Sequence, residues 1–541
     1  MVKLSRFSLL SALVVTASAT DVVVPKHLPT RELLRDGYAY SLEPVWTQDY
    51  ISSNLTRNLM KVIASITGKP PTLRVGGNTG DQTYYHPELN VSAAALPNTT
   101  VTNTFNISNA WFEQWGSYFP DGTDFLYTLN LKDNSSAWEN AVREAGAAYS
   151  VLGDKLKLIE LGNEIDHFIN KGWRPPTWNV AMYVQQWRNI SSQIVSSSWY
   201  KAASHPPKFQ AAVFADPPWL PDQQDEIDDF DIINLTRAGL TEQDKIGSYA
   251  VHLYPQSTCD TARWYRLSLN LLSNHSVLWH NVSQYVPQVA AADKAGIPLV
   301  FGETNSASCS GRSGISDTFG AALWNVDYVL LAASIGMPHV YFHLGANAEY
   351  SSFVPLPYQH KNESLEAGIR SLFYGHYFMA HVLASNKQQR VAQIPTANSS
   401  DFSGYAIYSP GHRHHEELHK LVFIDLQVWN GTQGLSNPST LSITDSTSHS
   451  AGLRPVRKVS VSTSWKAGTC LDIIRLQAPG TNAKSEISVS GVSFESQTGD
   501  QVGEPQGETV IVGEQGRVCF EMQAAEAVLI EGKQLNDRTV Y

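Results

Sequence analysis

The sequence predicts an α/β fold, a (β/α)8 TIM barrel followed by an antiparallel β-sandwich domain, on three observations. The chain has 541 residues, more than one hydrophobic core usually supports. Up to about residue 386, short apolar runs alternate with longer amphipathic stretches, as parallel strands alternate with crossover helices. Beyond that point short alternating segments are separated by Gly, Ser, Pro and Asn, which is typical of antiparallel strands.

Eight apolar runs are the predicted barrel strands. They are Tyr38–Leu42, Thr72–Val75, Phe125–Leu131, Leu156–Leu161, Phe209–Phe214, Ser248–Tyr254, Pro298–Phe301 and Val340–Leu344. Amphipathic spacing predicts helices at Ala137–Leu152, Val180–Ser197, Asn281–Ala295 and Phe319–Ile335, and a closing helix at Leu365–Leu383. We therefore expect the barrel within residues 20–386 and the β-sandwich within 387–541, with the run Val22–Val24 as a candidate extra strand of the second domain.

The first 19 residues have the pattern of a secretory signal peptide. Lys3 and Arg6 precede an apolar stretch, Phe7–Val15, and Ala17-Ser18-Ala19 is a small-residue cleavage site. N-x-[ST] sequons recur along the chain, from Asn54 to Asn430. We expect a secreted, extracellular glycoprotein. No later apolar segment is long enough to predict a membrane span.

Charge and cysteine content narrow the function classes. The formal net charge is −11 and the pI about 5.9, which disfavours nucleic acid and long sulfated chains as partners but allows local recognition of one carboxylate. The four cysteines form two separated pairs, Cys259 with Cys309 and Cys470 with Cys519, and we expect a disulfide within each. None has a zinc-site spacing, so we predict no structural metal. We also expect no cofactor.

Two glutamates follow buried strands directly. Leu156–Leu161 leads into Gly162-Asn163-Glu164, and Pro298–Phe301 leads into Gly302-Glu303. Hydrolysis of a glycosidic bond with retention needs two carboxyl groups about 5–5.5 Å apart. In a barrel, such groups are expected at the carboxyl ends of different strands. The fourth and seventh strands therefore predict a retaining glycosidase.

The Asn163-Glu164 and Glu303 segments resemble a large clan of (β/α)8-barrel glycosidases. Arg74-Val-Gly-Gly-Asn78, His252-Leu-Tyr254 and the second domain make the chain similar to glycoside hydrolase family 79, which contains β-glucuronidases and heparanases. The resemblance implies that Glu164 is the acid/base, Glu303 the nucleophile, and Asn163 a ligand of the sugar 2-hydroxyl.

The roles of these residues lead to further expectations. We expect the Tyr254 hydroxyl to hydrogen-bond Glu303 and keep it ionised, and burial beside Glu303 to raise the pKa of Glu164. Glu43 is a candidate to accept hydrogen bonds from sugar hydroxyls, or alternatively to form a salt bridge at the barrel mouth. Tyr350 resembles the carboxylate-binding tyrosine of the family. The loop 304–312 lacks a second tyrosine that family members can carry there.

The leading interpretation is an exo-β-glucuronidase that removes terminal glucuronic acid, or its 4-O-methyl form, from a glycan or glycoside. A heparanase-like endo-enzyme is disfavoured because no basic cluster accompanies the strand-end motifs. A clan relative that cleaves a neutral sugar remains an alternative. A carbohydrate-binding protein on an inactive barrel is a further one, although an inactive barrel usually loses one of the two glutamates.

Overall fold

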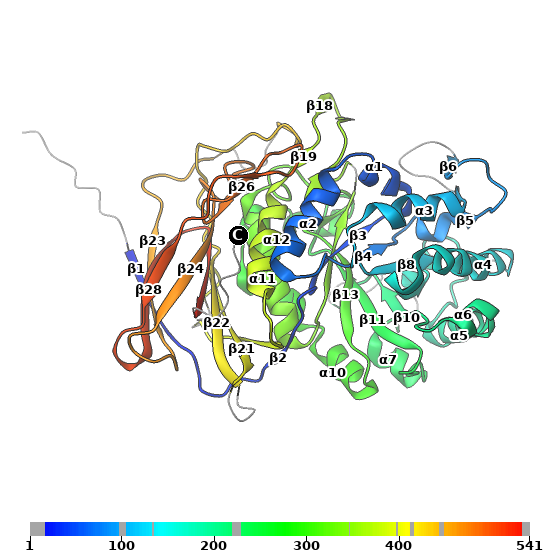
Figure 1. Cartoon of the computed structure of the whole chain (residues 1–541), viewed down its shortest axis with the longest axis horizontal. Coiled ribbons are helices and arrows are strands. Elements are labelled where there is room, and N and C mark those ends of the chain that lie inside the picture. The colour runs from blue at the N-terminus through cyan, green and yellow to red at the C-terminus, as the bar shows by residue number, and fades with distance from the viewer. Residues whose placement is uncertain are drawn as a thin grey trace, which may run out of the picture.

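The computed structural model contains a barrel and a β-domain that lie beside each other (Figure 1). It describes residues 17–96, 104–132, 135–218, 229–345, 347–396, 399–411, 416–442 and 448–532. Residues 1–16 of the predicted signal peptide lie outside this part of the chain. None of the helices in the described ranges combines the length and the apolar character that a membrane crossing needs.

Eight parallel strands close into the barrel in chain order, which confirms the predicted fold. They are β3 (Tyr38–Leu42), β4 (Leu73–Val75), β8 (Phe125–Leu129), β9 (Leu156–Leu161), β10 (Lys208–Phe214), β11 (Ile246–Leu253), β13 (Leu299–Thr304) and β15 (Val340–Leu344). All eight predicted runs are confirmed. Their apolar character follows from burial on both faces, since the barrel interior and the surrounding helices both exclude water.

Helices cover the outside of the barrel. They include α2 (Leu55–Thr67), α3 (Asn109–Tyr118), α4 (Ser135–Leu152), α5 (Val180–Ser196), α7 (Ile232–Arg237), α9 (His275–Ser283), α10 (Val286–Ala295), α11 (Phe319–Ile335) and α12 (Ser371–Leu383). The predicted helices that correspond to α4, α5 and α11 are confirmed. The predicted helix Asn281–Ala295 is instead divided between α9 and α10. Proline lacks an N–H and fits the first turn of a helix, and Pro287 occupies that place in α10.

The closing helix α12 begins six residues later than predicted. Leu365 lies in the short strand β18 (Glu363–Leu365), and β19 (Gly368–Ile369) pairs with β16 (Phe353–Val354). Arg370 then caps α12 while its buried guanidinium bonds the carbonyls of Ala348 and Ser439. These tertiary contacts outweigh the helical spacing of the apolar residues before Ser371.

The second domain consists of two facing sheets whose strands pair mainly antiparallel. The larger contains β2 (Arg31–Leu33), β20 (Gln389–Gln393), β21 (Phe402–Pro410), β22 (Glu416–Asp425), β30 (Glu526–Gly532), β24 (Cys470–Gln477), β25 (Ser488–Val489) and β28 (Glu508–Ile511). The smaller contains β1 (Ala17–Val23), β23 (Val456–Ser462) and β29 (Arg517–Gln523). The first described residues, from Ala17 onward, thus supply strands to this domain, and β1 pairs with β23 in parallel.

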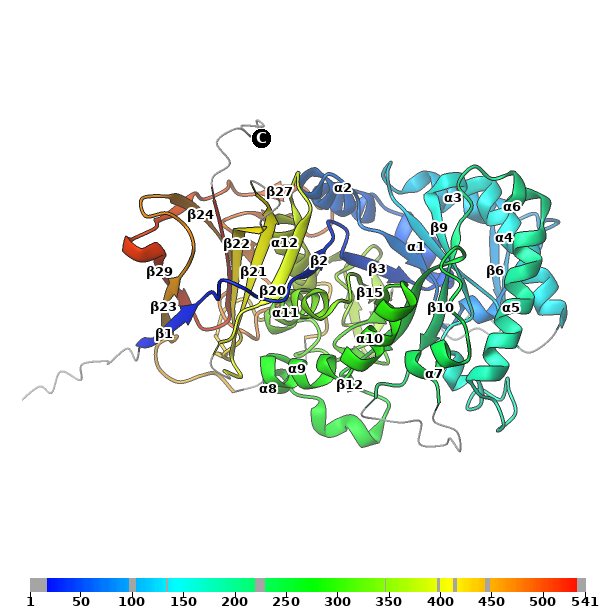
Figure 2. The same cartoon turned by 90° about the horizontal axis from the view of Figure 1, so that it is seen from below.

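Helices α11 and α12 lie between the barrel strands and the second domain in both views (Figures 1 and 2). Both helices are buried along almost their whole length, because one side packs on the barrel and the other on the larger sheet. One continuous apolar core therefore extends from the barrel into the second domain, and a smaller core fills the space between its two sheets.

The structure confirms one predicted disulfide and shows that the other is wrong. Cys259 and Cys309 are bonded, whereas Cys470 and Cys519 are free thiols. Cys470 lies in β24 of the larger sheet and Cys519 in β29 of the smaller one. In each strand the next residue is buried in the core between the sheets. Since side chains alternate along a strand, the two thiols point outward on opposite faces of the domain.

Candidate active site

A cavity of about 780 Å³ opens at the carboxyl ends of the barrel strands. Five predicted site residues line it: Glu43, Glu164, Tyr254, Glu303 and Tyr350. Each follows or ends a different barrel strand, so the parallel topology brings together side chains that are far apart in sequence. Asn163 is fully buried and does not belong to the lining.

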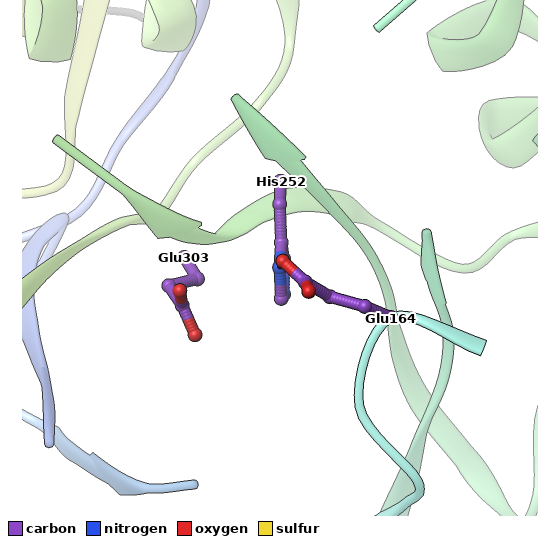
Figure 3. A group of neighbouring side chains, drawn as sticks. All are labelled: Glu164, His252 and Glu303. Atoms are coloured by element: carbon purple, nitrogen blue, oxygen red, sulfur yellow. The ribbon is translucent and has the colours of Figure 1, made fainter. Parts of the chain in front are cut away.

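The two glutamates face each other across this cavity with His252 between them (Figure 3). One oxygen of Glu164, one oxygen of Glu303 and a ring nitrogen of His252 lie within 4.8 Å of one another. This proximity matches the carboxyl spacing of retaining glycosidases, which is about 5–5.5 Å, and not the wider spacing of inverting ones.

A turn with left-handed backbone presents Glu164. Gly162 has φ +80° and Glu164 itself φ +51°. A Cβ at Gly162 would meet Leu131 at 2.8 Å, so glycine is the residue that fits. Left-handed backbone is uncommon for a residue other than glycine, and such strained residues cluster at active sites and ligand-binding sites.

Buried donors keep Glu303 ionised. The Tyr254 hydroxyl donates to Glu303 Oε1 at 2.7 Å, which is the predicted contact, and Arg74 Nη1 donates to Oε2 at 2.8 Å. Burial pushes the pKa of Glu303 upward, but the nearby charges of His343, His252 and Arg74 outweigh it and hold the pKa below its ordinary value. Glu303 therefore has the charge state of a nucleophile.

The expectation that Glu164 has a raised pKa is wrong. Burial does push it upward, but hydrogen bonds from His167 and His252 and the charge of Lys171 hold it well below the ordinary value. His252 Nδ1 lies 3.2 Å from Oε1, and His167 Nδ1 and Lys171 Nζ lie 3.6 and 3.9 Å from Oε2. The cationic neighbours, which the sequence argument did not include, thus reverse the direction of the shift.

Arg74 connects the residues at the base of the site, a role that is not predicted from the sequence. Its guanidinium is fully buried and donates to Glu160, Glu303, Ser41 and Asn163. Such a planar fork can bond several oxygens at once in fixed geometry. One sequence signal could have indicated this role. Arg74 in β4 and Glu160 in β9 are charged residues within otherwise mainly apolar strands, which suggests that they are buried as a pair.

Asn163 is held from two sides and retains one unused donor. Its backbone N–H donates to Asp81 at 2.9 Å, and its Oδ1 accepts from Arg74 at 2.7 Å. Its buried Nδ2 has no hydrogen-bond partner in the structure. An unpaired buried donor is costly to leave without an acceptor, so Nδ2 is the group of this turn that can still form a hydrogen bond.

Glu43 lines the cavity and also stabilises the neighbouring turn. Its carboxylate accepts from the backbone N–H groups of Asn78 and Thr79 at 2.9 and 2.8 Å. At Gly77, which has φ +125°, a Cβ would lie 2.6 Å from the carboxylate of Glu43. His343 Nε2 lies 4.0 Å from it. Both alternatives for Glu43, a cavity acceptor and a structural partner, therefore have support in the geometry.

Two groups of histidine and carboxylate side chains have atoms within 4.8 Å, one with Glu164, His252 and Glu303 and the other with Asp166, His167 and Asp216. In the first, His252 is close to Glu164, and in the second, His167 is hydrogen-bonded to Asp216. These contacts account for both groups without a metal ion, and we assign neither to one.

The C-terminal residues 404–529 match the model of the glycosyl hydrolase family 79 C-terminal beta domain. This part of the second domain is similar to the C-terminal domain of family 79. The finding confirms the resemblance predicted from the sequence.

Similar proteins cover nearly the whole chain. A β-glucuronidase of Neurospora crassa is 29% identical over 88% of this chain and 88% of its own, and one of Aspergillus niger is 28% identical over 91% and 90%. A 4-O-α-L-rhamnosyl-β-D-glucuronidase of Fusarium oxysporum has the same fold, with a TM-score of 0.74, 22% identity, and coverage of 95% of this chain and 100% of its own.

Proposed function

We propose that this protein is a retaining exo-β-glucuronidase, in which Glu303 is the nucleophile and Glu164 the acid/base. The observation that carries the proposal is the pair of carboxylates, whose nearest oxygens lie within 4.8 Å at the ends of β9 and β13. The family 79 domain and the similarity to two fungal β-glucuronidases support the choice of sugar.

The reaction proceeds by double displacement. An oxygen of Glu303 attacks the anomeric carbon, while Glu164 gives a proton to the departing glycosidic oxygen. Water then attacks the anomeric carbon on the face opposite its bond to Glu303, which is the face that the leaving group left. The water gives a proton to Glu164, and the bond to Glu303 breaks. Arg74 and Tyr254 hold the nucleophile in place through its two oxygens, and the free Nδ2 of Asn163 supports a hydrogen bond to the sugar 2-hydroxyl.

The basic residues of the cavity favour exo over endo action. Among the described lining residues the lysine and the arginine are Lys171 and Arg263. Lys171 donates to Asn78 Oδ1 at 2.7 Å, and Arg263 donates to Asp260 at 2.7 Å and to the carbonyl of Tyr254 at 3.0 Å. A cavity whose cations already have such partners suits a single uronate better than a sulfated chain.

Tyr350 is our candidate for recognition of the substrate carboxylate. It lines the cavity beside Tyr254, with the two ring centroids 6.3 Å apart, and burial raises its pKa well above the usual tyrosine value. Its hydroxyl therefore stays protonated and able to donate to an anion. We also propose that the protein is secreted after removal of residues 1–19, which N-terminal sequencing of the exported protein would test.

A panel of 4-nitrophenyl glycosides tests the proposed activity. We expect cleavage of the β-glucuronide, no cleavage of the β-glucoside, β-xyloside or α-arabinofuranoside, and loss of activity in Glu303→Gln. Cleavage of a neutral glycoside alone would favour the clan-relative alternative. If wild type and Glu303→Gln were equally inert on every substrate, the carbohydrate-binding alternative would replace the proposal.

A further inference from the structure

Beside Glu164 lies a histidine–carboxylate pair that the mechanism above does not use. His167 belongs to the short helix η4 (Ile165–Phe168), and Asp216 follows β10. His167 Nε2 lies 2.9 Å from Asp216 Oδ1, and its other nitrogen, Nδ1, faces Glu164 Oε2 at 3.6 Å. Both His167 and Asp216 line the catalytic cavity.

Two residues near the end of β10, shortly before Asp216, have unusual backbone geometry. Ala212 and Val213 near the end of β10 have φ of +74° and +62°, and the register with β11 shifts between Ala212 and Phe214. A β-branched residue in this region is a true outlier. Such strain persists where the surrounding structure demands it, often beside a functional group.

Asp166 fixes the strand end that follows this bulge. It is buried, and its Oδ2 accepts from the backbone N–H groups of Ala215 and Asp216 at 2.7 and 2.9 Å. The residue adjacent to His167 in sequence therefore positions the carboxylate that binds His167. The bulge and these two hydrogen bonds together hold Asp216 against the Nε2 side of the ring.

The Asp216 contact decides which ring nitrogen can exchange a proton. An acceptor at Nε2 keeps a proton on that nitrogen, so a second proton on the ring must sit on Nδ1, which faces Glu164. Burial acts to lower the pKa of His167, but Asp216 and Glu164 outweigh it and raise the pKa well above the ordinary value. The pKa of Glu164 is held low and that of His167 is raised, so the two directions favour the proton on His167 over Glu164.

We propose that His167, oriented by Asp216, is a positioning residue that stores the proton which Glu164 delivers to the leaving group. As substrate binds, the proton moves from Nδ1 to Glu164 and on to the glycosidic oxygen, while the C1–O bond breaks and Glu303 bonds C1. In the second half, water gives its proton to Glu164, which returns it to His167. Catalytic hydrogen bonds are often long without substrate, and 3.6 Å is such a length. This inference rests on the proposed function.

Other titratable groups face the same site and contribute to any pH profile. Lys171, in the turn after η4, and His252 in β11 approach Glu164, and Glu303 approaches from β13. Tyr285, which precedes α10, interacts with Asp216 and Asp166. None of these groups is changed in the variants below. A difference between the pH profiles of wild type and variant is therefore due to the His167–Asp216 pair.

The test compares two leaving groups in His167→Gln. Phenyl β-glucuronide needs a proton on its leaving oxygen, whereas 2,4-dinitrophenyl β-glucuronide departs without one. We expect kcat/KM to fall about 100-fold for the phenyl substrate and less than about threefold for the dinitrophenyl substrate. The basic limb of the phenyl pH profile should move to lower pH by about one pH unit, because the proton must then reside on Glu164 alone.

Two further variants separate this role from a structural one. Asp216→Asn retains the histidine but removes the charge at Nε2, and it should move the basic limb in the same direction by a smaller amount. The control is His205→Gln, which breaks a similar pair on the surface, where Nδ1 lies 3.2 Å from Asp154, and should leave the profile unchanged.

The outcomes distinguish this inference from the proposed function. Two results with an active wild type would overturn only the proposal that His167 stores the proton. One is an equal loss on both substrates in His167→Gln, and the other is a basic limb of the pH profile that does not move in that variant. A wild type inactive on both glucuronides would overturn the proposed function and this inference together.

Discussion

Removal of the Tyr254 hydroxyl should shift the lower pH limit of activity. In Tyr254→Phe the ring remains, but Glu303 Oε1 loses a donor at 2.7 Å. A hydrogen bond to a charged group contributes about 1.5–3 kcal/mol, and Glu303 is only 6% exposed, so water is poorly placed to replace it. Since about 1.4 kcal/mol corresponds to one pKa unit, the pKa of Glu303 should rise by about one to two units.

The direction in which the acid limb moves follows from the requirement that Glu303 be ionised to act as nucleophile. The pKa of Glu303 in wild type lies below the ordinary value, so the nucleophile is charged at every pH above that low value. A rise of the pKa in Tyr254→Phe moves the acid limb of kcat/KM to higher pH. Activity at pH values on that limb should fall about 10- to 100-fold, while activity well above it should recover.

The assay is kcat/KM for 4-nitrophenyl β-glucuronide between about pH 3 and 8. Tyr200→Phe is the matched control, because the Tyr200 hydroxyl donates to the carbonyl of Pro207 at 3.0 Å and Tyr200 is not among the described residues that line the cavity. An acid limb at the same pH in wild type and Tyr254→Phe would refute the reasoning. So would a loss of the same size at every pH, because that result would indicate a misplaced nucleophile instead of a raised pKa.

Three further changes have defined outcomes. Glu164→Ala should lose about 10²–10⁴-fold in kcat/KM on phenyl β-glucuronide, and azide should restore turnover on activated substrates and give a β-glycosyl azide; no acceleration by azide would argue against the acid/base role. Replacement of Cys259 and Cys309 by Ser should raise KM about tenfold with little change in kcat, because the two cysteines line the cavity and their disulfide joins the loops after β11 and β13. An unchanged KM in steady-state kinetics would contradict this prediction. Lys484→Met should lower the free energy of unfolding in urea by about 3–5 kcal/mol, because it removes the cation 2.8 Å from the buried carboxylate of Asp317. A decrease below about 1 kcal/mol would disprove this estimate.

The barrel could be predicted from sequence because each of its strands is buried on both faces. Runs such as Phe125–Leu129 contain no charged residue and are buried throughout, and the helices between the strands keep a separate period. The positions of Glu164 and Glu303 at strand ends followed from the same count of strands. The start of α12 did not follow, because the buried contacts of Arg370 come from segments distant in sequence.

Other features depend on neighbours that sequence distance hides. His167 and Asp216 are 49 residues apart and meet because β9 and β10 are adjacent in the barrel. The direction of the Glu164 pKa shift required cations from η4 and β11. Cys470 and Cys519 are separated by a similar stretch of sequence, but the alternation of side chains along their strands sends them to opposite faces.

The two glutamates differ in their nearest polar neighbours, and this difference matches their proposed roles. Glu303 is hydrogen-bonded by Arg74, whose charge is permanent, and by Tyr254, whose pKa lies far above its usual value, while His343 lies farther away at 3.7 Å. The nearest neighbours of Glu164 are instead two histidines, His252 at 3.2 Å and His167 at 3.6 Å. A nucleophile needs a constant charge, whereas an acid/base must gain and lose a proton in each cycle. Titratable neighbours serve the second requirement, because a proton that leaves Glu164 has a site beside it to which it can return.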